Sequence, residues 1–233
     1  MGVPPRERSR AWGRSHVGGS ATPLGVPLLE ELGGVRARRR QAGGNVTTGP
    51  RLAAMETVEL LLDADTERRV QRVWNHLAAI GQPSQEHHGH PTNRPHLTLA
   101  SVDSLTTSAA ESLRALLGSP DCPAVLDGLV RFSGRAHVLA WRVRPVAELL
   151  GLHSAVHDAL RGAGSEPAHP LLRPGDWQPH ITLGRSRGPA WQLPDEQLLP
   201  LESRGPVHGR FSAARTYDAR TRTTTCLSSE RDT

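Results

Sequence analysis

Two short segments of the sequence repeat one pattern: a proline, a histidine, an apolar residue, a threonine and a leucine. They occupy residues 95–99 and 179–183. Side chains alternate between the two faces of a strand, so His96 and Thr98 share one face, as His180 and Thr182 do. The preceding proline lacks an N–H and suits the first residue of a strand. Each segment is therefore expected to be a strand with one imidazole and one hydroxyl on its polar face.

These residue types suit the cleavage of a phosphodiester bond. Such a reaction needs a base that takes a proton from the attacking group and an acid that gives one to the departing oxygen. Histidine suits both tasks because its unperturbed pKa of about 6.5 lies near neutral pH. The hydroxyls of Thr98 and Thr182 can donate hydrogen bonds to phosphate oxygens, where negative charge develops. We predict His180 as base and His96 as acid, with these two roles interchangeable on sequence alone, and no metal or cofactor.

The repetition carries more weight than either segment. The chain has 12 histidines, so one such segment could arise by chance. Two copies that both follow proline, 84 positions apart at matching places in the chain, are much harder to obtain by accident. The alternative is that both histidines are structural side chains of their strands. We favour the catalytic interpretation.

Three further residues near these segments are candidates for substrate contacts. Arg185 follows the second segment and could contact a substrate phosphate, as could Arg94 before the first. Trp177 lies three residues before His180 and could stack on a base or ribose, with core packing as the alternative.

The other clustered histidines are interpreted as non-functional. Three lie in a Gly/Pro-containing loop at positions 87, 88 and 90, where Glu86 is the adjacent carboxylate. This composition favours a solvated loop over a metal site. His153 and His157 are four residues apart on a predicted helix and are expected at its surface. No metal ligands are therefore assigned.

Hydrophobic periodicity predicts an α/β (α+β) fold. Strands are expected at residues 56–62, 96–102, 124–132, 137–143 and 178–184, with two further candidates at 207–213 and 216–227. Helices are expected from Asp63 or Asp65 to Ile80, at 106–118, and after Pro145. The last helix should bury a stripe of aliphatic side chains that includes Leu150. The chain thus has two similar halves, each with a His-x-Thr strand after a helix.

Residues 1–54 differ in composition from the remainder. They hold nine of the 28 arginines and three of the 23 acidic residues, many Gly and Pro, and no sustained apolar period. Such a segment is predicted to be a disordered tail, and residues 55–229 the domain. Met55 opens a clean strand and is a candidate for the true start, with an Arg-rich transit peptide as the alternative reading of the tail.

The remainder of the chain is nearly neutral, with 19 arginines and 20 acidic residues, which argues against a DNA-binding regulator. Because no run of eighteen apolar residues occurs, we expect no membrane-spanning helix. Two cysteines fit a reducing cytoplasm. We expect a monomer there.

The paired segments resemble the signature of the two-histidine (2H) phosphoesterases, in particular the bacterial 2′-5′ RNA ligase-like RNA cyclic phosphodiesterases. The resemblance implies two βαββ-like lobes, related by a pseudo-twofold axis around a central groove. It also implies that His96 and His180 are the acid–base pair and that Thr98 and Thr182 bind phosphate. The implied substrate is RNA or a nucleotide with a 2′,3′-cyclic phosphate end, which is commonly hydrolysed to a 2′-phosphate. The resemblance also implies that the protein could catalyse 2′-5′ RNA ligation, the reverse reaction.

One departure is that Ser101 and Val102 stand where many relatives have an aromatic residue, which puts base stacking there in doubt. Two alternatives stay open. One is a 2H enzyme that acts on small substrates, such as ADP-ribose cyclic phosphate or 2′-5′ oligonucleotides. The other is a non-catalytic module that binds RNA ends.

Overall fold

The two halves of the chain have the same order of elements, a strand, a helix and a strand that begins with a histidine. In the first half these are β1 (Glu56–Leu62), α1 (Ala64–Ala79) and β2 (His96–Val102). In the second half they are β4 (His137–Val143), α3 (Ala147–Gly162) and β5 (His180–Ser186). The remaining elements are α2 (Thr107–Leu117), β3 (Cys122–Phe132), α4 (Asp195–Leu198), β6 (Val207–Asp218) and β7 (Thr223–Cys226).

The structure is a computed structural model that describes residues 55–134 and 136–228. The predicted tail at 1–54 lies outside the described residues, so the tail and its boundary stay predictions. The described residues form an α+β fold with one seven-stranded antiparallel sheet, as the sequence indicated. None of the described helices is both long and apolar enough to cross a membrane.

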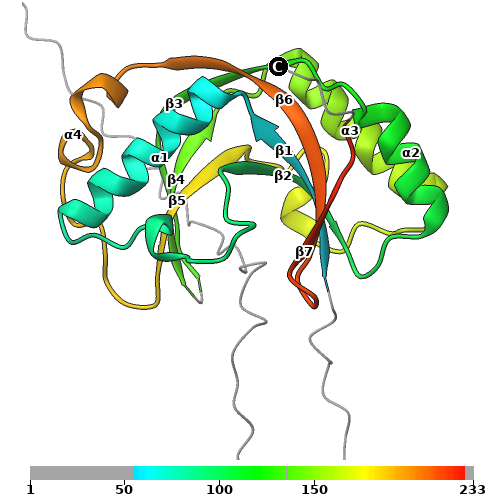
Figure 1. Ribbon diagram of the computed structural model, residues 1–233, viewed down its shortest axis with the longest axis horizontal. Helices are drawn as coiled ribbons and strands as arrows, with labels where there is room; N and C mark the ends of the chain where they lie inside the picture. Colours follow the sequence, from blue (N-terminus) through cyan, green and yellow to red (C-terminus); the bar gives the residue numbers. More distant parts are fainter. Residues whose placement is uncertain (1–54, 135, 229–233) are drawn as a thin grey trace, which may run out of the picture.

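The sheet relates the two halves by a pseudo-twofold axis. Its strand order is β2-β1-β6-β3-β4-β5, with β7 paired to β6. The axis passes between the central strands β6 and β3, and the two histidine strands lie at the two ends of this path. The sheet bends into an arch, with α1 on one side and α2 and α3 on the other (Figure 1). The bend brings β2 and β5 close to each other, and the two strands make contact.

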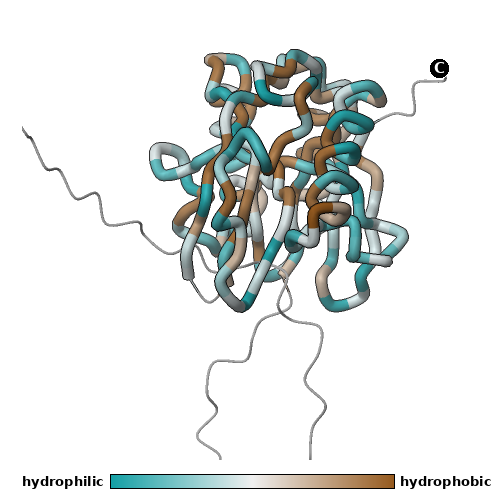
Figure 2. The backbone as a smooth tube through the Cα atoms, turned by 90° about the vertical axis from the view of Figure 1, so that its left-hand side faces the viewer, coloured by the Kyte–Doolittle hydropathy of each residue, from teal (hydrophilic) through white to brown (hydrophobic). Residues whose placement is uncertain are grey.

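Local sequence explains why α1 forms where it does. The Asp63 carboxylate accepts a hydrogen bond from the backbone N–H of Thr66, which caps the first turn. Val70, Val73 and Leu77 then recur at helical spacing and are fully buried. Figure 2 shows that apolar segments of this kind gather in the interior, whereas the loops are hydrophilic.

The buried face of α3 differs from the predicted aliphatic stripe. Leu150 is 43% exposed, whereas His153 and His157 are 1% and 2% exposed, so their predicted surface positions were wrong. Both rings follow Leu149 at helical spacing on the inner face. Their polar atoms are satisfied because each Nε2 donates to a carbonyl, at 2.8 Å to Leu172 and 3.3 Å to Leu99.

The C-terminal strands also differ from the prediction. The sequence indicated two strands separated at residues 214–215, but β6 runs unbroken through both positions. It lies in the centre of the sheet, where Ala214 pairs with Leu60 and Arg215 pairs with Glu59. Arg215 can be buried there because Glu59 neutralises its charge.

The buried histidine pair predicts that the protein loses stability at mildly acid pH. Burial, together with the charge of His157, lowers the pKa of His153 to about 4, and burial also lowers the pKa of His157. Both rings are neutral when folded, whereas the unfolded chain binds protons at pH below about 6.5. The free energy of unfolding should therefore fall as pH decreases from 7 to 5, by on the order of 1–2 kcal/mol for His153.

Urea denaturation of the protein at pH 7 and pH 5 measures this change. The variant His153→Gln cannot titrate, so its unfolding free energy should depend less on pH even though it starts lower at pH 7. An identical pH dependence of the variant and the parent would contradict the assignment.

Candidate active site

Both motif histidines are held in the same way at the start of their strands. Nδ1 of His96 lies 2.7 Å from the carbonyl oxygen of Arg94, and Nδ1 of His180 lies 2.7 Å from that of Gln178. A carbonyl can only accept, so Nδ1 carries the proton in each neutral ring. This arrangement leaves both Nε2 atoms available to exchange a proton with a bound molecule.

Two tryptophans fix the histidine strands from the opposite half of the chain. Nε1 of Trp177, just before β5, donates to the carbonyl of Thr98 on β2 at 3.1 Å. Nε1 of Trp74, on α1, donates to the carbonyl of Thr182 on β5 at 3.1 Å. These carbonyls lie on strands at the ends of the sheet path, where a further neighbouring strand is lacking, so the indoles satisfy groups that the sheet leaves unpaired. The bonds therefore tie the two motif strands to each other's lobes.

The position of Trp177 gives it a packing role. Its side chain is 8% exposed, and its ring stacks on His153 with the ring centroids 3.9 Å apart. Trp177 also does not line the pocket beside His96. The contact with a base or ribose predicted for Trp177 stays a prediction.

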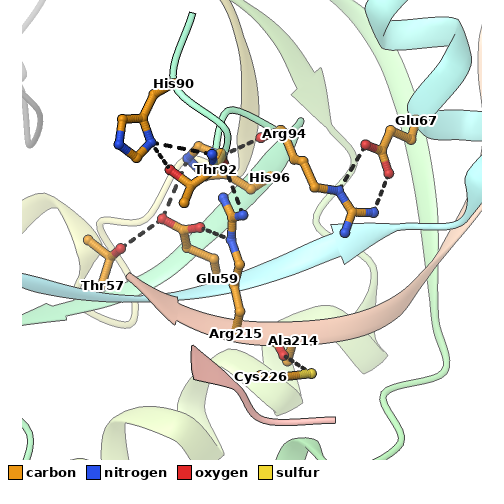
Figure 3. A network of polar contacts seen from close by, with 10 residues as sticks. All are labelled: Thr57, Glu59, Glu67, His90, Thr92, Arg94, His96, Ala214, Arg215 and Cys226. Carbon is orange, nitrogen blue, oxygen red and sulfur yellow. Dashed lines mark hydrogen bonds and ion pairs between the residues drawn. The ribbon is translucent and has the colours of Figure 1, made fainter. Parts of the chain in front are cut away.

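A buried carboxylate lies beside His96 (Figure 3). Glu59 is 3% exposed, and its Oε1 lies 3.7 Å from Nε2 of His96. Thr57 donates its hydroxyl to Oε1 at 2.8 Å, and Arg215 donates Nε to Oε2 at 2.7 Å. Arg215 also donates Nη1 to the carbonyl of Thr92 at 3.0 Å. Sequence reasoning missed Glu59 and Arg215, although a glutamate within the apolar strand 56–62 was a signal.

His180 has different surroundings. Its ring is half-buried and lies 4.6 Å from the ring of Phe132, centroid to centroid. Phe132 belongs to a small apolar cluster with Val138 and Ala140. Burial lowers the pKa of His180 to about 4, and the charges of Arg185 and His96 act in the same direction. The hydrogen bond to the Gln178 carbonyl opposes this shift. His180 is therefore neutral at pH 7.

The remaining predicted residues lie on the two histidine strands or directly before them. Thr98 and Thr182 are half-buried, and their hydroxyls make no hydrogen bond to any residue in the described ranges 55–134 and 136–228. Arg185 lies on β5, near enough to His180 for its charge to act on the ring. Arg94 instead forms a two-point ion pair with Glu67 of α1, at 3.0 Å and 2.5 Å, so it is engaged within the protein.

A pocket with a volume of about 350 Å³ opens beside His96. Most of its lining residues have polar side chains, and they come from β1, β6, the start of β2 and the loops before β2 and after β6. They are Glu59, His88, Gly89, His90, Thr92, Asn93, His96, Arg215, Tyr217, Ala219 and Arg222. The loop histidines at 88 and 90, interpreted from sequence as solvated, thus lie at the pocket. Among the residues that the structure describes, no three His, Cys, Asp or Glu side chains are grouped to hold a metal ion.

The sequence profile of the 2′-5′ RNA ligase superfamily matches residues 63–217, so the chain belongs to this superfamily, which contains the two-histidine phosphoesterases. The family inferred from the two segments is confirmed. LigT of Escherichia coli, solved in complex with NADP⁺, is 20% identical over 75% of this chain and 94% of LigT, with a TM-score of 0.49. Usb1 of Kluyveromyces marxianus is 13% identical over 75% of this chain and 98% of Usb1, with a TM-score of 0.46. No curated protein matches the sequence.

The crossed indole bonds predict the cost of replacing each tryptophan. Trp74→Phe and Trp177→Phe both remove the donor and leave a strand carbonyl without its partner, which should lower the unfolding free energy by about 1–3 kcal/mol beyond the loss of packing. Chemical denaturation measures this loss.

Trp141→Phe is a matched control. Trp141 is fully buried, and its indole nitrogen has no hydrogen-bond partner within the described part of the chain. The same change there removes the same atoms without orphaning a carbonyl, so it should cost less. Equal losses at all three positions would mean that the indole bonds do not stabilise the fold.

Proposed function

We propose that this protein hydrolyses 2′,3′-cyclic phosphates at RNA or nucleotide ends by a two-histidine acid–base mechanism. The observation that carries the proposal is the matched pair of imidazoles on β2 and β5. Each is tethered through Nδ1 and keeps Nε2 available, and each has a threonine hydroxyl two residues further along the strand. Membership of the superfamily supports the same class of reaction.

His180 is the base in this mechanism. A base must be unprotonated at working pH, and burial lowers the pKa of His180 to about 4, so the neutral ring dominates at pH 7. Its Nε2 takes a proton from water as the water oxygen bonds to phosphorus. In the same step the bond from phosphorus to one ribose oxygen breaks, and that oxygen receives a proton from Nε2 of His96. The products are a phosphate monoester and a free ribose hydroxyl.

The threonine hydroxyls and one arginine bind the phosphate. Thr98 and Thr182 donate to the non-bridging oxygens, which gain charge in the transition state. Arg185 adds a positive charge on the His180 side. The polar pocket beside His96 has a volume of about 350 Å³, within the size range of small-molecule sites, and accommodates the nucleoside. The residues of the chain supply both proton transfers, so we propose a metal-independent reaction.

The direct test replaces each histidine by alanine and measures hydrolysis of a 2′,3′-cyclic nucleotide. Each of His96→Ala and His180→Ala should lower kcat by about 100-fold or more, because each removes one of the two proton transfers. His208→Ala is the control, since this residue is exposed on β6 and lies away from the pocket. Full activity in either motif variant would exclude the mechanism.

The same assay separates the proposal from its rivals. Cyclic-phosphate-ended RNA, ADP-ribose cyclic phosphate and 2′-5′ oligonucleotides are compared at equal concentration. A higher kcat/KM with either small substrate than with RNA would favour the 2H enzyme that acts on small substrates. Tight binding of RNA ends without turnover would indicate a binding module.

The depressed pKa of His180 predicts a broad activity range on the acid side. A base is lost as pH falls through its own pKa, so kcat/KM should stay high below pH 6.5 and fall only toward pH 4. The rate profile of the protein should be recorded within its stable range, which circular dichroism defines. A fall centred near pH 6.5 in folded protein would contradict His180 as the base.

A further inference from the structure

The two halves of the sheet differ at one pair of matching positions. On β1, Glu59 is the partner of the motif threonine Thr98. On β4, the partner of the other motif threonine, Thr182, is Ala140. The pseudo-twofold axis therefore relates a carboxylate beside the first histidine strand to a methyl group beside the second.

The difference continues on the next strand. Glu59 pairs across the sheet with Arg215 of β6, whereas Ala140 pairs with Val130 of β3. The first lobe thus has a buried ion pair where the second has apolar side chains. Phe132 adds its ring to the apolar side. The two imidazoles have the same tether and opposite surroundings.

Both carboxylate oxygens of Glu59 are bound by neighbouring side chains. Arg215 binds Oε2 and the Thr57 hydroxyl binds Oε1, so both oxygens are satisfied in a site that is only 3% exposed. Its Oε1 lies 3.7 Å from Nε2 of His96, close enough to stabilise a positive charge on the ring. The distance exceeds that of a hydrogen bond, so the Nε2 proton stays available to a substrate.

Other ionisable groups face the same space. Arg215 comes from β6, His88 and His90 from the loop before β2, and Arg222 from the turn after β6. His180 on β5 interacts electrostatically with His96. Among these residues Glu59 is the carboxylate, and the others are histidines and arginines.

We propose that Glu59 is the positioning residue that holds His96 as the proton donor. Because Ala140 stands at the matching position of the second lobe, His180 lacks such a carboxylate, and this difference makes His96 the acid and His180 the base. This inference rests on the proposed function. Water is then activated on the apolar side, by His180. The departing ribose oxygen lies on the His96 side, so the nucleoside attached to it lies over the polar pocket.

The test compares two substrates that differ in their need for an acid. A 2′,3′-cyclic nucleotide expels a ribose alkoxide, which must be protonated, whereas a 4-nitrophenyl phosphodiester of a nucleoside expels a stable phenolate. Glu59→Gln should lower kcat for the cyclic nucleotide by about 10- to 100-fold with KM changed less than about twofold, because the proton donor is impaired and binding is not. With the 4-nitrophenyl ester its kcat should stay within about threefold of the parent.

Two motif variants calibrate this comparison. His96→Ala should follow the pattern of Glu59→Gln, and His180→Ala should lose activity on both substrates. An equal loss by Glu59→Gln on both substrates would show a structural role and overturn the inference. If the unaltered protein hydrolyses neither substrate, the proposed function itself fails, which is a separate outcome.

Glu59→Gln leaves Arg215 buried without its anion and could impair folding. The double variant Glu59→Gln with Arg215→Gln removes both charges and keeps two side chains that can hydrogen-bond each other. It should show the same dependence on the leaving group. Glu59→Asp keeps the negative charge and should restore part of kcat on the cyclic nucleotide. Failure of this rescue in a folded variant would also count against a role through charge.

Discussion

The crossed hydrogen bonds from two indoles to two strand carbonyls are the constraint on which the rest of the structure depends. The histidine strands β2 and β5 lie at opposite ends of the sheet path, and they meet because the sheet bends. Trp74 and Trp177 each reach across to the strand of the other half, at the carbonyls of Thr182 and Thr98. Any joint action of the two imidazoles on one bound molecule requires this closure. The indoles stabilise it without occupying the polar faces where the histidines lie.

Much of the fold could be predicted because its signals are local. The alternation of polar and apolar residues in strands such as 96–102 depends on a few adjacent residues, and so does the Asp63 cap. Burial between the halves is not local. His153 and His157 were expected at the helix surface because no third metal ligand could be named beside them, yet carbonyls from distant segments satisfy them. Glu59 was overlooked for the same reason, since its partner Arg215 lies 156 residues further along the chain.

The two halves show how a repeated architecture can give two matching histidines unlike surroundings. The tether from Nδ1 to a carbonyl two residues earlier is the same for His96 and His180, with the same 2.7 Å distance. What differs is the neighbouring strand, which supplies Glu59 on one side and Ala140 on the other. Two histidines in identical surroundings would titrate alike and would compete for one role. The symmetry places the rings, and its local failure gives each ring a different neighbour on the adjacent strand.

The crossed packing also limits how the two halves can diverge. The His157 ring on α3 donates a hydrogen bond to the Leu99 carbonyl of β2, and Trp74 on α1 donates one to the Thr182 carbonyl of β5. Each helix therefore binds the histidine strand of the other half of the chain. A substitution that shifts α1 should therefore displace His180 on β5 before His96, and one that shifts α3 should displace His96 on β2 before His180. Sequence change in the two halves must be mutually compatible. A gene for one half alone would encode a helix without its strand and a strand without its helix.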